Sequence, residues 1–397
     1  MDIGIVSLRW LGHHTAHTKW TIKSLTELGH NVHLFTPKDH EFIGEFEDIE
    51  RMTVCLLPSS PNEKQSPIQS YIESLFYRHR CFTEIFDSNI DLDVLHIPSL
   101  DQLQIPFLFT STRENPPFPI VATIHRTDPF QKFKNDTVLS NKTAKNILRH
   151  PPRRVTKYAT EKLVADETID RLLVHSEQMK QRTVRKFHRI EHNSVRVVPN
   201  PTPPIQQDVS QREARKKIGI ESPDPVLLFF GTLRHEKGPD ILLDAAKMIK
   251  QPSTFLFAGK PGEITERDVV ETNTNSEVNI KSRLEYIPEN EVDLYFIAAD
   301  CLVLPYRNQE GISSSLRRAC MANKHIIGPE SSDIGTTIEQ NQLGQTFETG
   351  SVESLMENIS YFLEENQKYP KKGVSSYAKE QHYQNAGKEL EIIYSNL

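Results

Sequence analysis

The stretch VLLFFGTLRHEKGPDILLDAAKMI (residues 226–249) joins an apolar run, a glycine turn and a helical pattern. The run predicts a buried strand that ends at Gly231, and Pro239 is typical of a first helical turn. Between them lie two cations, Arg234 and Lys237. Free amides at a helix start favour an anion, and two cations beside a strand end could clamp a diphosphate. The alternative is an ordinary basic loop before a capped helix.

A second turn of this kind, YRNQEGISSSLRRAC (306–320), follows the apolar run CLVLP (301–305). Glu310 places a carboxylate just past a buried strand, and Gly311 allows the backbone to approach a ligand closely. Plain N-capping by Glu and Ser is the alternative. Three residues would offer amides at a helix N-terminus, where a phosphate is favourable: Ile312, Ser313 and Ser314.

Short apolar runs alternate with amphipathic stretches along the whole chain. Most of them lack strict alternation, which is typical of strands that are covered on both faces of a parallel sheet. The pattern restarts after a Pro-rich segment at 198–211, so we predict two doubly wound α/β domains. The expected strands lie at 3–8, 32–36, 52–57, 94–98, 120–125, 171–176, 195–200, 226–231, 254–259, 284–288, 301–305 and 325–328.

The length of 397 residues exceeds one ordinary core and also indicates two domains. We expect Rossmann-like domains at 1–201 and 202–375, and a C-terminal helix at 376–397 that packs back toward the first domain. Ligands of such sheets bind beyond the carboxyl ends of the strands. The sites are therefore expected at strand-to-helix turns that face the cleft between the domains.

Composition favours a cytoplasmic protein. The chain is 37% hydrophobic and 25% charged, which is typical of globular proteins. Its four cysteines are spaced like neither a zinc site nor a disulfide framework. The N-terminus MDIGIVSLRW reads as a strand rather than a signal peptide, and no run of about 18 apolar residues is present.

Positive charge is concentrated in residues 126–200, which hold 17 basic and 8 acidic residues. One interpretation is a solvated face. The other is a surface for an anionic partner, with peripheral contact at the inner face of a membrane. The segment NKTAKNILRHPPRRVTKY (141–158) mixes apolar residues with cations, as a membrane-contacting segment would. An internal helix with exposed lysines explains it as well.

Together the two turns resemble the donor-binding half of the retaining glycosyltransferases of family 4 (glycosyl transferases group 1), which have the GT-B fold. That family carries Gly-Arg-Leu and Lys-Gly after one strand, an aspartate before another, and then Pro and Glu-Gly. The residues that fall in this order here are Gly231, Leu233, Lys237, Gly238, Asp300, Pro305, Glu310 and Gly311. The first half agrees more loosely, through Gly12, His13, His17, Gly29, His30 and a strand that ends at His125.

The resemblance implies transfer of a sugar from a nucleotide-diphosphate sugar, with retention, to a glycan, a lipid-linked saccharide or a small molecule. It implies neither a cofactor nor a metal nor a nucleic-acid partner, and no Asp-x-Asp is placed after a strand. As catalytic residues, Glu310 would hold hydroxyls of the donor sugar and His125 would contact it from the other domain. The donor-binding residues implied are Gly12, His13, Gly231, Arg234, Lys237, Gly311, Ile312, Ser313, Ser314 and Arg318.

Some positions depart from the family. His13 and Thr232 replace a glycine and an arginine, and Pro201 replaces the glycine after Asn200. Arg318 stands where the family has a second glutamate, which holds the ribose; a guanidinium can only donate hydrogen bonds. Two rival hypotheses therefore remain: a non-catalytic GT-B partner subunit or glycan-binding protein, and a sugar-nucleotide epimerase.

Overall fold

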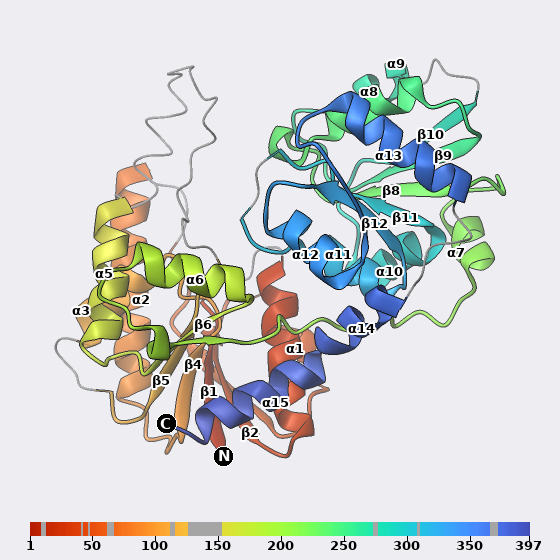
Figure 1. The fold of residues 1–397 in the computed structure, drawn as a ribbon. Helices are drawn as coiled ribbons and strands as arrows, with labels where there is room; N and C mark the ends of the chain where they lie inside the picture. Colours follow the sequence, from red (N-terminus) through yellow and green to blue (C-terminus); the bar gives the residue numbers. More distant parts are fainter. Residues whose placement is uncertain are drawn as a thin grey trace. The chain divides into compact units, whose positions relative to one another are not determined.

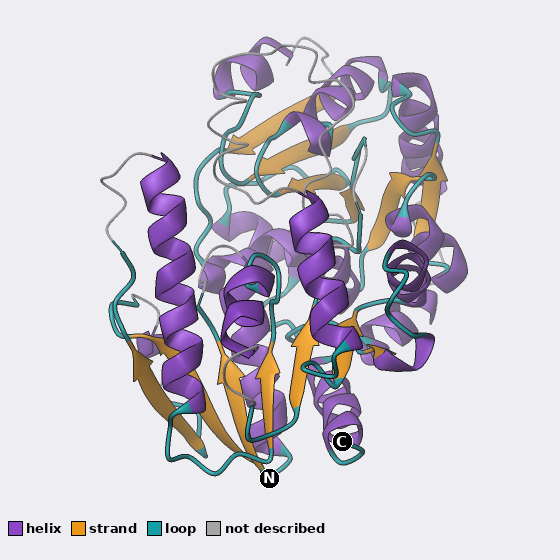
Figure 2. Cartoon of the chain, turned by 90° about the vertical axis from the view of Figure 1, so that its left-hand side faces the viewer, coloured by secondary structure: helices purple, strands orange, loops and turns teal. Residues whose placement is uncertain are grey.

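The chain folds into two compact units, seen here in a computed structural model (Figure 1). Unit 1 comprises Met1–Pro201 together with Tyr383–Leu397, and unit 2 comprises Thr202–His382. Each unit is a parallel sheet with helices on both faces (Figure 2), so the predicted fold class is confirmed. The structure describes residues 1–8, 13–40, 43–46, 48–61, 67–111, 116–125, 153–272, 277–307, 310–365 and 372–397.

The sheet of unit 1 has the order β3-β2-β1-β4-β5-β6-β7, and all pairs are parallel. Its strands are β1 Asp2–Val6, β2 Asn31–Pro37, β3 Met52–Leu57, β4 Val94–Ile97, β5 Ile120–Thr123, β6 Arg171–Val174 and β7 Val195–Val197. Its helices are α1 His13–Glu27, α2 Pro67–Phe86, α3 Gln104–Ser111, α5 Arg153–Ala165, α6 Glu177–Lys186 and α15 Tyr383–Tyr394.

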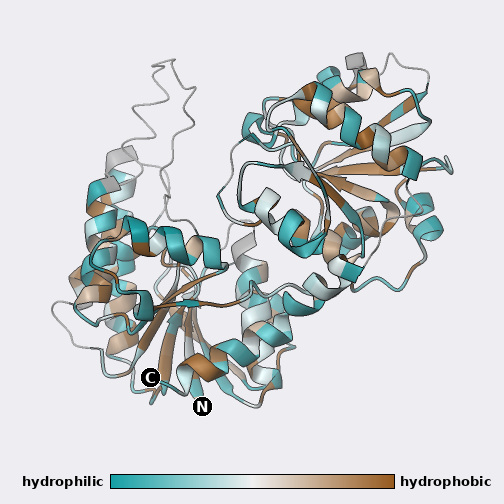
Figure 3. Cartoon of the chain, viewed as in Figure 1, coloured by the Kyte–Doolittle hydropathy of each residue, from teal (hydrophilic) through white to brown (hydrophobic). Residues whose placement is uncertain are grey.

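Both faces of this sheet are covered, which explains the unbroken apolar runs of the sequence. In β5, Ile120 and Ala122 pack with residues of α2, α3, α5 and α6, whereas Val121 packs with residues of α1 and α15. Figure 3 shows hydrophobic strands and helices with hydrophilic outer faces. Among the described residues, no helix combines the length and the apolar character that crossing a membrane requires.

The C-terminal helix α15 packs against α1 within unit 1 (Figure 1). Gly387 makes the close approach possible, because a Cβ there would lie 2.7 Å from Cβ of Ser24. The ring of Tyr383 lies 4.8 Å from that of Trp20, and its hydroxyl donates to the Glu27 carboxylate at 2.8 Å. The last helix of the chain thus completes the core on one face of the first sheet.

Unit 2 has the parallel order β10-β9-β8-β11-β12-β13. Its strands are β8 Val226–Phe230, β9 Ser253–Ala258, β10 Val278–Arg283, β11 Cys301–Val303, β12 His325–Pro329 and β13 Gly344–Phe347. Its helices are α7 Gln211–Lys217, α8 Pro239–Met248, α9 Glu266–Thr272, α10 Glu289–Ala298, α11 Ser314–Met321, α12 Asp333–Asn341, α13 Val352–Glu365 and α14 Lys372–Glu380.

The two edge strands of unit 2 differ from the prediction. The prediction of a strand at 284–288 is wrong, because β10 ends at Arg283 and the residues after it form a loop. β13 was not predicted at all. Both strands are at an edge of the sheet and only partly buried, so their sequences VNIKSR and GQTF lack the apolar run that marks a central strand.

Candidate functional site

The carboxyl ends of β8 and β11 lie side by side in the middle of the unit 2 sheet. The two strands are parallel neighbours, so the turns that follow them meet at one edge. The carbonyl oxygen of Phe230, at the end of β8, accepts a hydrogen bond from Ser315 Oγ at 3.3 Å. Because Ser315 belongs to the first turn of α11, this bond joins the two turns that the sequence singles out.

The turn after β8 depends on two glycines with positive φ, Gly231 at 127° and Gly238 at 65°. A Cβ on Gly238 would lie 1.9 Å from the carbonyl oxygen of Pro305, so only glycine fits where the turns after β8 and β11 touch. A 3₁₀ turn, His235–Lys237, leads into α8, which has Pro239 at its start as predicted.

Lys237 places its ammonium group at this edge of the sheet. Nζ lies 5.5 Å from the centroid of the Tyr306 ring. A Cβ on Gly231 would lie only 2.5 Å from this Nζ, so the ammonium group also lies against the Gly231 backbone. Tyr306 is 1% exposed and its hydroxyl is 3.4 Å from Ser313 Oγ, so the ring is a fixed support for the cation. Within the described residues, Lys237 forms no ion pair, which leaves its charge available to an anion.

Arg234, the second predicted cation, is arranged differently. Its Nε lies 2.9 Å from the carboxylate of Glu236, and more than half of its side chain is exposed. The positive charge of Arg234 is therefore shared with a neighbour in the same turn. Its role in donor binding stays a prediction.

Arg307 holds the turn in shape and was missed by the sequence analysis. Its Nη1 donates to the carbonyl oxygen of His235 at 2.6 Å and to the carboxylate of Asp240 at 2.8 Å. Burial acts to raise the pKa of Asp240, but hydrogen bonds and charge from Arg307 outweigh it, so this pKa is lowered. Arg307 follows β11 whereas Asp240 lies in the first turn of α8, and no local sequence pattern predicts such a distant pair.

The Glu310-Gly311 turn leads from β11 into α11. Gly311 has φ of 79°, and its N–H donates to the carboxylate of Asp333, at the start of α12, at 2.7 Å. Ser313 is the N-cap of α11, and its Oγ accepts from the backbone N–H of Ser315 at 3.2 Å. N-capping by a serine is thus observed, and the Gly311 amide is already used inside the unit. The remaining predicted residues of this turn are half-buried or exposed: Glu310, Ile312 and Ser314.

Arg318 is bound by two carboxylates of α10. Its Nε donates to Asp293 at 2.9 Å and its Nη1 to Glu289 at 2.6 Å. Burial acts to lower the pKa of Arg318, but the charges of Glu289 and Asp293 outweigh it and raise this pKa. The guanidinium therefore joins α11 to α10. Its part in donor binding stays a prediction.

In unit 1, His125 lies just beyond the carboxyl end of β5. Its Nε2 is 2.9 Å from the carbonyl oxygen of Pro98, and its backbone N–H donates to Asp101 at 3.2 Å. Gly12 lies outside the described residues, and His13 begins α1 with its side chain outside the described part.

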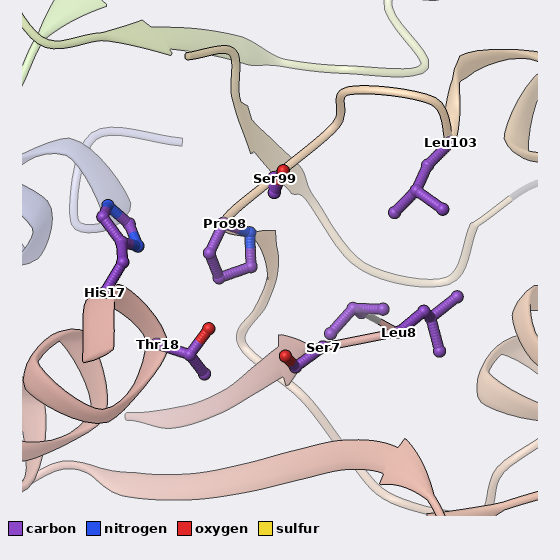
Figure 4. A pocket seen from close by; sticks show the side chains of 8 residues that line it. Ser7, Leu8, His17, Thr18, Pro98, Ser99 and Leu103 are labelled. Carbon is purple, nitrogen blue, oxygen red and sulfur yellow. The ribbon is translucent and has the colours of Figure 1, made fainter. Parts of the chain in front are cut away.

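Two further histidines surround His125, and the sequence analysis assigned neither to the site. His175 follows β6, the neighbour of β5, and its Nε2 lies 3.2 Å from His125 Nδ1. His17, in α1, has its ring centroid 5.0 Å from that of His125. The sequence held a signal for His175. Like His125, it lies at the end of a predicted strand, and the two strands are consecutive in the chain. His17 also borders a pocket in unit 1 (Figure 4), lined by Val6, Ser7, Leu8, His17, Thr18, Pro98, Ser99 and Leu103.

Comparisons with known proteins agree with the fold. The D-inositol 3-phosphate glycosyltransferase of Corynebacterium aurimucosum is 22% identical over 95% of this chain and 89% of its own. Sucrose-phosphate synthase from Thermosynechococcus elongatus has a TM-score of 0.73 at 14% identity, covering 100% of this chain and 98% of that one. Anabaena HepE, solved with UDP and glucose, has a TM-score of 0.70 at 12% identity, covering 100% of both chains.

The family models divide the chain much as the structure does. The model described as Glycosyltransferase Family 4 matches residues 15–204, and the model described as Glycosyl transferases group 1 matches residues 210–381. The first match lies largely in unit 1 and the second lies in unit 2. The chain therefore belongs to the group 1, family 4 glycosyltransferases, with the GT-B fold.

Proposed function

We propose that this chain transfers a sugar from a nucleotide-diphosphate sugar to an acceptor, with retention of anomeric configuration. The observation that carries the proposal is the position of Lys237, whose ammonium rests over Tyr306 beside the start of α11. The leaving group of this reaction is a nucleoside diphosphate, on which negative charge develops. A fixed cation and a helix N-terminus are groups that stabilise such charge.

Individual roles follow from the chemistry of each side chain. Lys237 would balance the diphosphate, with Arg234 assisting from the same turn, and no metal is needed for that purpose. Glu310 would accept hydrogen bonds from sugar hydroxyls and orient the ring. His125 would contact the sugar. Because its Nε2 lies 2.9 Å from the carbonyl oxygen of Pro98, a contact with the sugar through this nitrogen requires that hydrogen bond to open.

The proposal is tested with a panel of nucleotide-diphosphate sugars and a mixture of acceptors. Release of nucleoside diphosphate that depends on the acceptor is the expected result, and NMR of the product should show the anomeric configuration of the donor. An inverted product would overturn retention. Conversion of the donor into another nucleotide sugar, without any acceptor, would indicate an epimerase instead.

For the acceptor, we infer an anionic molecule at a membrane surface. The relative from Corynebacterium aurimucosum is named for a phosphorylated substrate. In unit 1, helix α3 packs against both α2 and α5, and all three carry exposed aromatic side chains: Phe76 at 70%, Phe109 at 60% and Tyr158 at 53%. Lys157 and Lys162 on α5 add cations, which are paired with Glu161 and Asp166. Aromatic and basic side chains together favour an anionic lipid interface. Residues 126–152 of the basic segment lie outside the described residues.

Vesicle flotation tests this contact. Wild-type protein should float with anionic vesicles and much less with neutral ones. Replacing both Phe76 and Tyr158 by Ala should weaken flotation, whereas Tyr361→Ala, which removes a similarly exposed aromatic from α13 of unit 2, should not. Equal failure to bind either vesicle would contradict the membrane contact and leave a freely diffusing acceptor.

The second candidate is a non-catalytic GT-B partner subunit, and Arg318 favours it. Position 318 offers no carboxylate to a ribose, and the arginine is held by Glu289 and Asp293. This candidate predicts that no donor is turned over with any acceptor, even when calorimetry detects nucleotide binding. Acceptor-dependent turnover would exclude it.

A further inference from the structure

Three histidines come together in unit 1 at the carboxyl edge of its sheet. His125 and His175 follow the neighbouring strands β5 and β6, and His17 comes from α1. The ring centroids of His17 and His175 are 5.5 Å apart, and those of His125 and His175 are 5.0 Å apart. Each ring offers one nitrogen, and the three nitrogens lie within 4.8 Å of one another.

The hydrogen bonds of two of these rings fix where their protons lie. His125 Nε2 faces the carbonyl oxygen of Pro98 at 2.9 Å, and His175 Nδ1 faces that of Val198 at 3.1 Å. A carbonyl oxygen only accepts, so each of these nitrogens carries a hydrogen. In neutral rings, the other nitrogens, His125 Nδ1 and His175 Nε2, then present lone pairs to each other at 3.2 Å. Two facing lone pairs repel unless a cation lies between them.

We propose that His17, His125 and His175 bind a divalent transition-metal ion of the zinc class. Zinc–nitrogen distances of about 2.0–2.1 Å in a tetrahedral site place two ligand nitrogens roughly 3.3 Å apart. The 3.2 Å between His125 Nδ1 and His175 Nε2 agrees with this value. The third nitrogen, from His17, lies within 4.8 Å of the other two and would have to move closer to complete the site.

The surroundings of the rings have the features of a metal site. Histidine ligands commonly donate their second N–H to a backbone carbonyl, which fixes tautomer and ring orientation, as Pro98 and Val198 do here. Three protein ligands leave a fourth position for water. His17 also borders the pocket of Figure 4, where Ser7, Thr18 and Ser99 supply hydroxyls beside the site.

The ligand set also predicts which ions bind. Imidazole nitrogens favour zinc, cobalt, nickel and copper, whereas magnesium and calcium prefer oxygen ligands. Protons compete for the same nitrogens, so affinity should fall as the solution is made more acidic. This inference goes beyond the proposed transfer reaction, in which the ion takes no part.

Metal titration of the metal-free protein tests the inference. At pH 7.5, we expect one tight zinc site per chain by calorimetry and, with cobalt, the intense visible absorption of a tetrahedral centre. Zinc should also raise the melting temperature of the protein, and magnesium should not. His17→Gln and His175→Gln should each weaken zinc binding by at least about tenfold to a hundredfold. His188→Gln removes an exposed histidine outside the cluster and should change nothing.

Circular dichroism and the melting temperature without metal show that each variant is folded. Zinc binding that is equally weakened by His188→Gln, or unaffected by both cluster variants, would overturn the proposal. So would a wild-type protein without tight zinc binding at pH 7.5, since the two facing nitrogens would then share a proton. No donor or acceptor is used, so this result is independent of whether sugar transfer is detected.

Discussion

At the scale of single residues, Lys237 carries the most specific expectation. Lys237→Ala removes a cation that lies over the Tyr306 ring, and a charge-assisted contact of this kind is worth on the order of 1.5–3 kcal/mol. Donor affinity measured by calorimetry should therefore fall roughly tenfold to a hundredfold. Lys247→Ala, which removes a lysine paired with Asp244 on the same helix α8, is the matched control. Unchanged donor binding in a folded Lys237→Ala protein would remove this lysine from the site.

Arg318 carries an expectation about stability. Arg318→Ala would leave Asp293, whose side chain is 4% exposed, without its cation. Breaking a buried ion pair from one side is strongly destabilising, so the free energy of unfolding should fall by on the order of 3 kcal/mol in urea titrations. Arg318→Glu should be worse, because it adds a third carboxylate to Asp293 and Glu289. A stability equal to wild type in both variants would contradict the ion pairs described.

Local motifs predicted the part of this site that is contiguous in the sequence. They did not predict the residues that are far apart in the sequence and meet only in the fold. Lys237 and Gly238 belong to one turn that is contiguous in the sequence. Arg307 and Tyr306 contact that turn only because β8 and β11 are neighbours in the sheet. The sequence of neither strand predicts which strand will lie beside it. The histidine cluster was hidden for the same reason: His17 and His125 both matched the family pattern, but only strand order and the packing of α1 bring them together with His175.

At the scale of elements, the contact between α1 and α15 depends on Gly387. In Gly387→Ala, the added Cβ would lie 2.7 Å from Cβ and 2.9 Å from the carbonyl oxygen of Ser24, so the helices must separate. Overpacking of this kind costs about 1–3 kcal/mol. Thermal denaturation should show a lower melting temperature for this variant. Gly44→Ala, where nothing lies within 4 Å, is the control; equal melting temperatures for both variants would contradict the close packing.

The central strands were predictable from their apolar runs, because each is buried on both faces. β10 and β13 were not, since an edge strand exposes part of its surface and its sequence resembles a loop. The prediction at 284–288 followed apolar residues such as Ile287, which is buried but belongs to a loop rather than to the sheet. Burial alone therefore does not separate a strand from a covered loop.

At the scale of the whole molecule, each unit contains a histidine whose surroundings oppose protonation: His96 is buried and His325 is half-buried. Burial, with a smaller contribution from His125, lowers the pKa of His96 in unit 1 to about 3. In unit 2, burial lowers the pKa of His325 to about 4, although its hydrogen bond to Gln345 opposes the shift. In the unfolded chain both pKa values return to about 6.5. At a pH between the folded and the unfolded pKa of each histidine, the unfolded state binds more protons than the folded state, so acid favours unfolding.

The free energy of unfolding should thus fall below pH 6.5 by up to about 1.4 kcal/mol per pH unit for each histidine, and neither should contribute a slope above that pH. Urea titrations between pH 8 and pH 4.5 measure the slope. His325→Gln should reduce it for unit 2 and leave unit 1 unchanged. The same acid slope for unit 2 in wild type and variant would show that His325 is not the group responsible.

The return of α15 to the first sheet also sets an order for synthesis. The Tyr394 hydroxyl bonds to Nδ1 of His96, which lies in β4, at 2.7 Å, so one face of that sheet is sealed only once the chain has been made as far as residue 394. At about 5–20 residues per second, residues 202–397 take roughly 10 to 40 s to emerge from the ribosome. During that time the nascent first unit exposes apolar strand residues that α15 later covers, and chaperones that recognise such surfaces have their opportunity then.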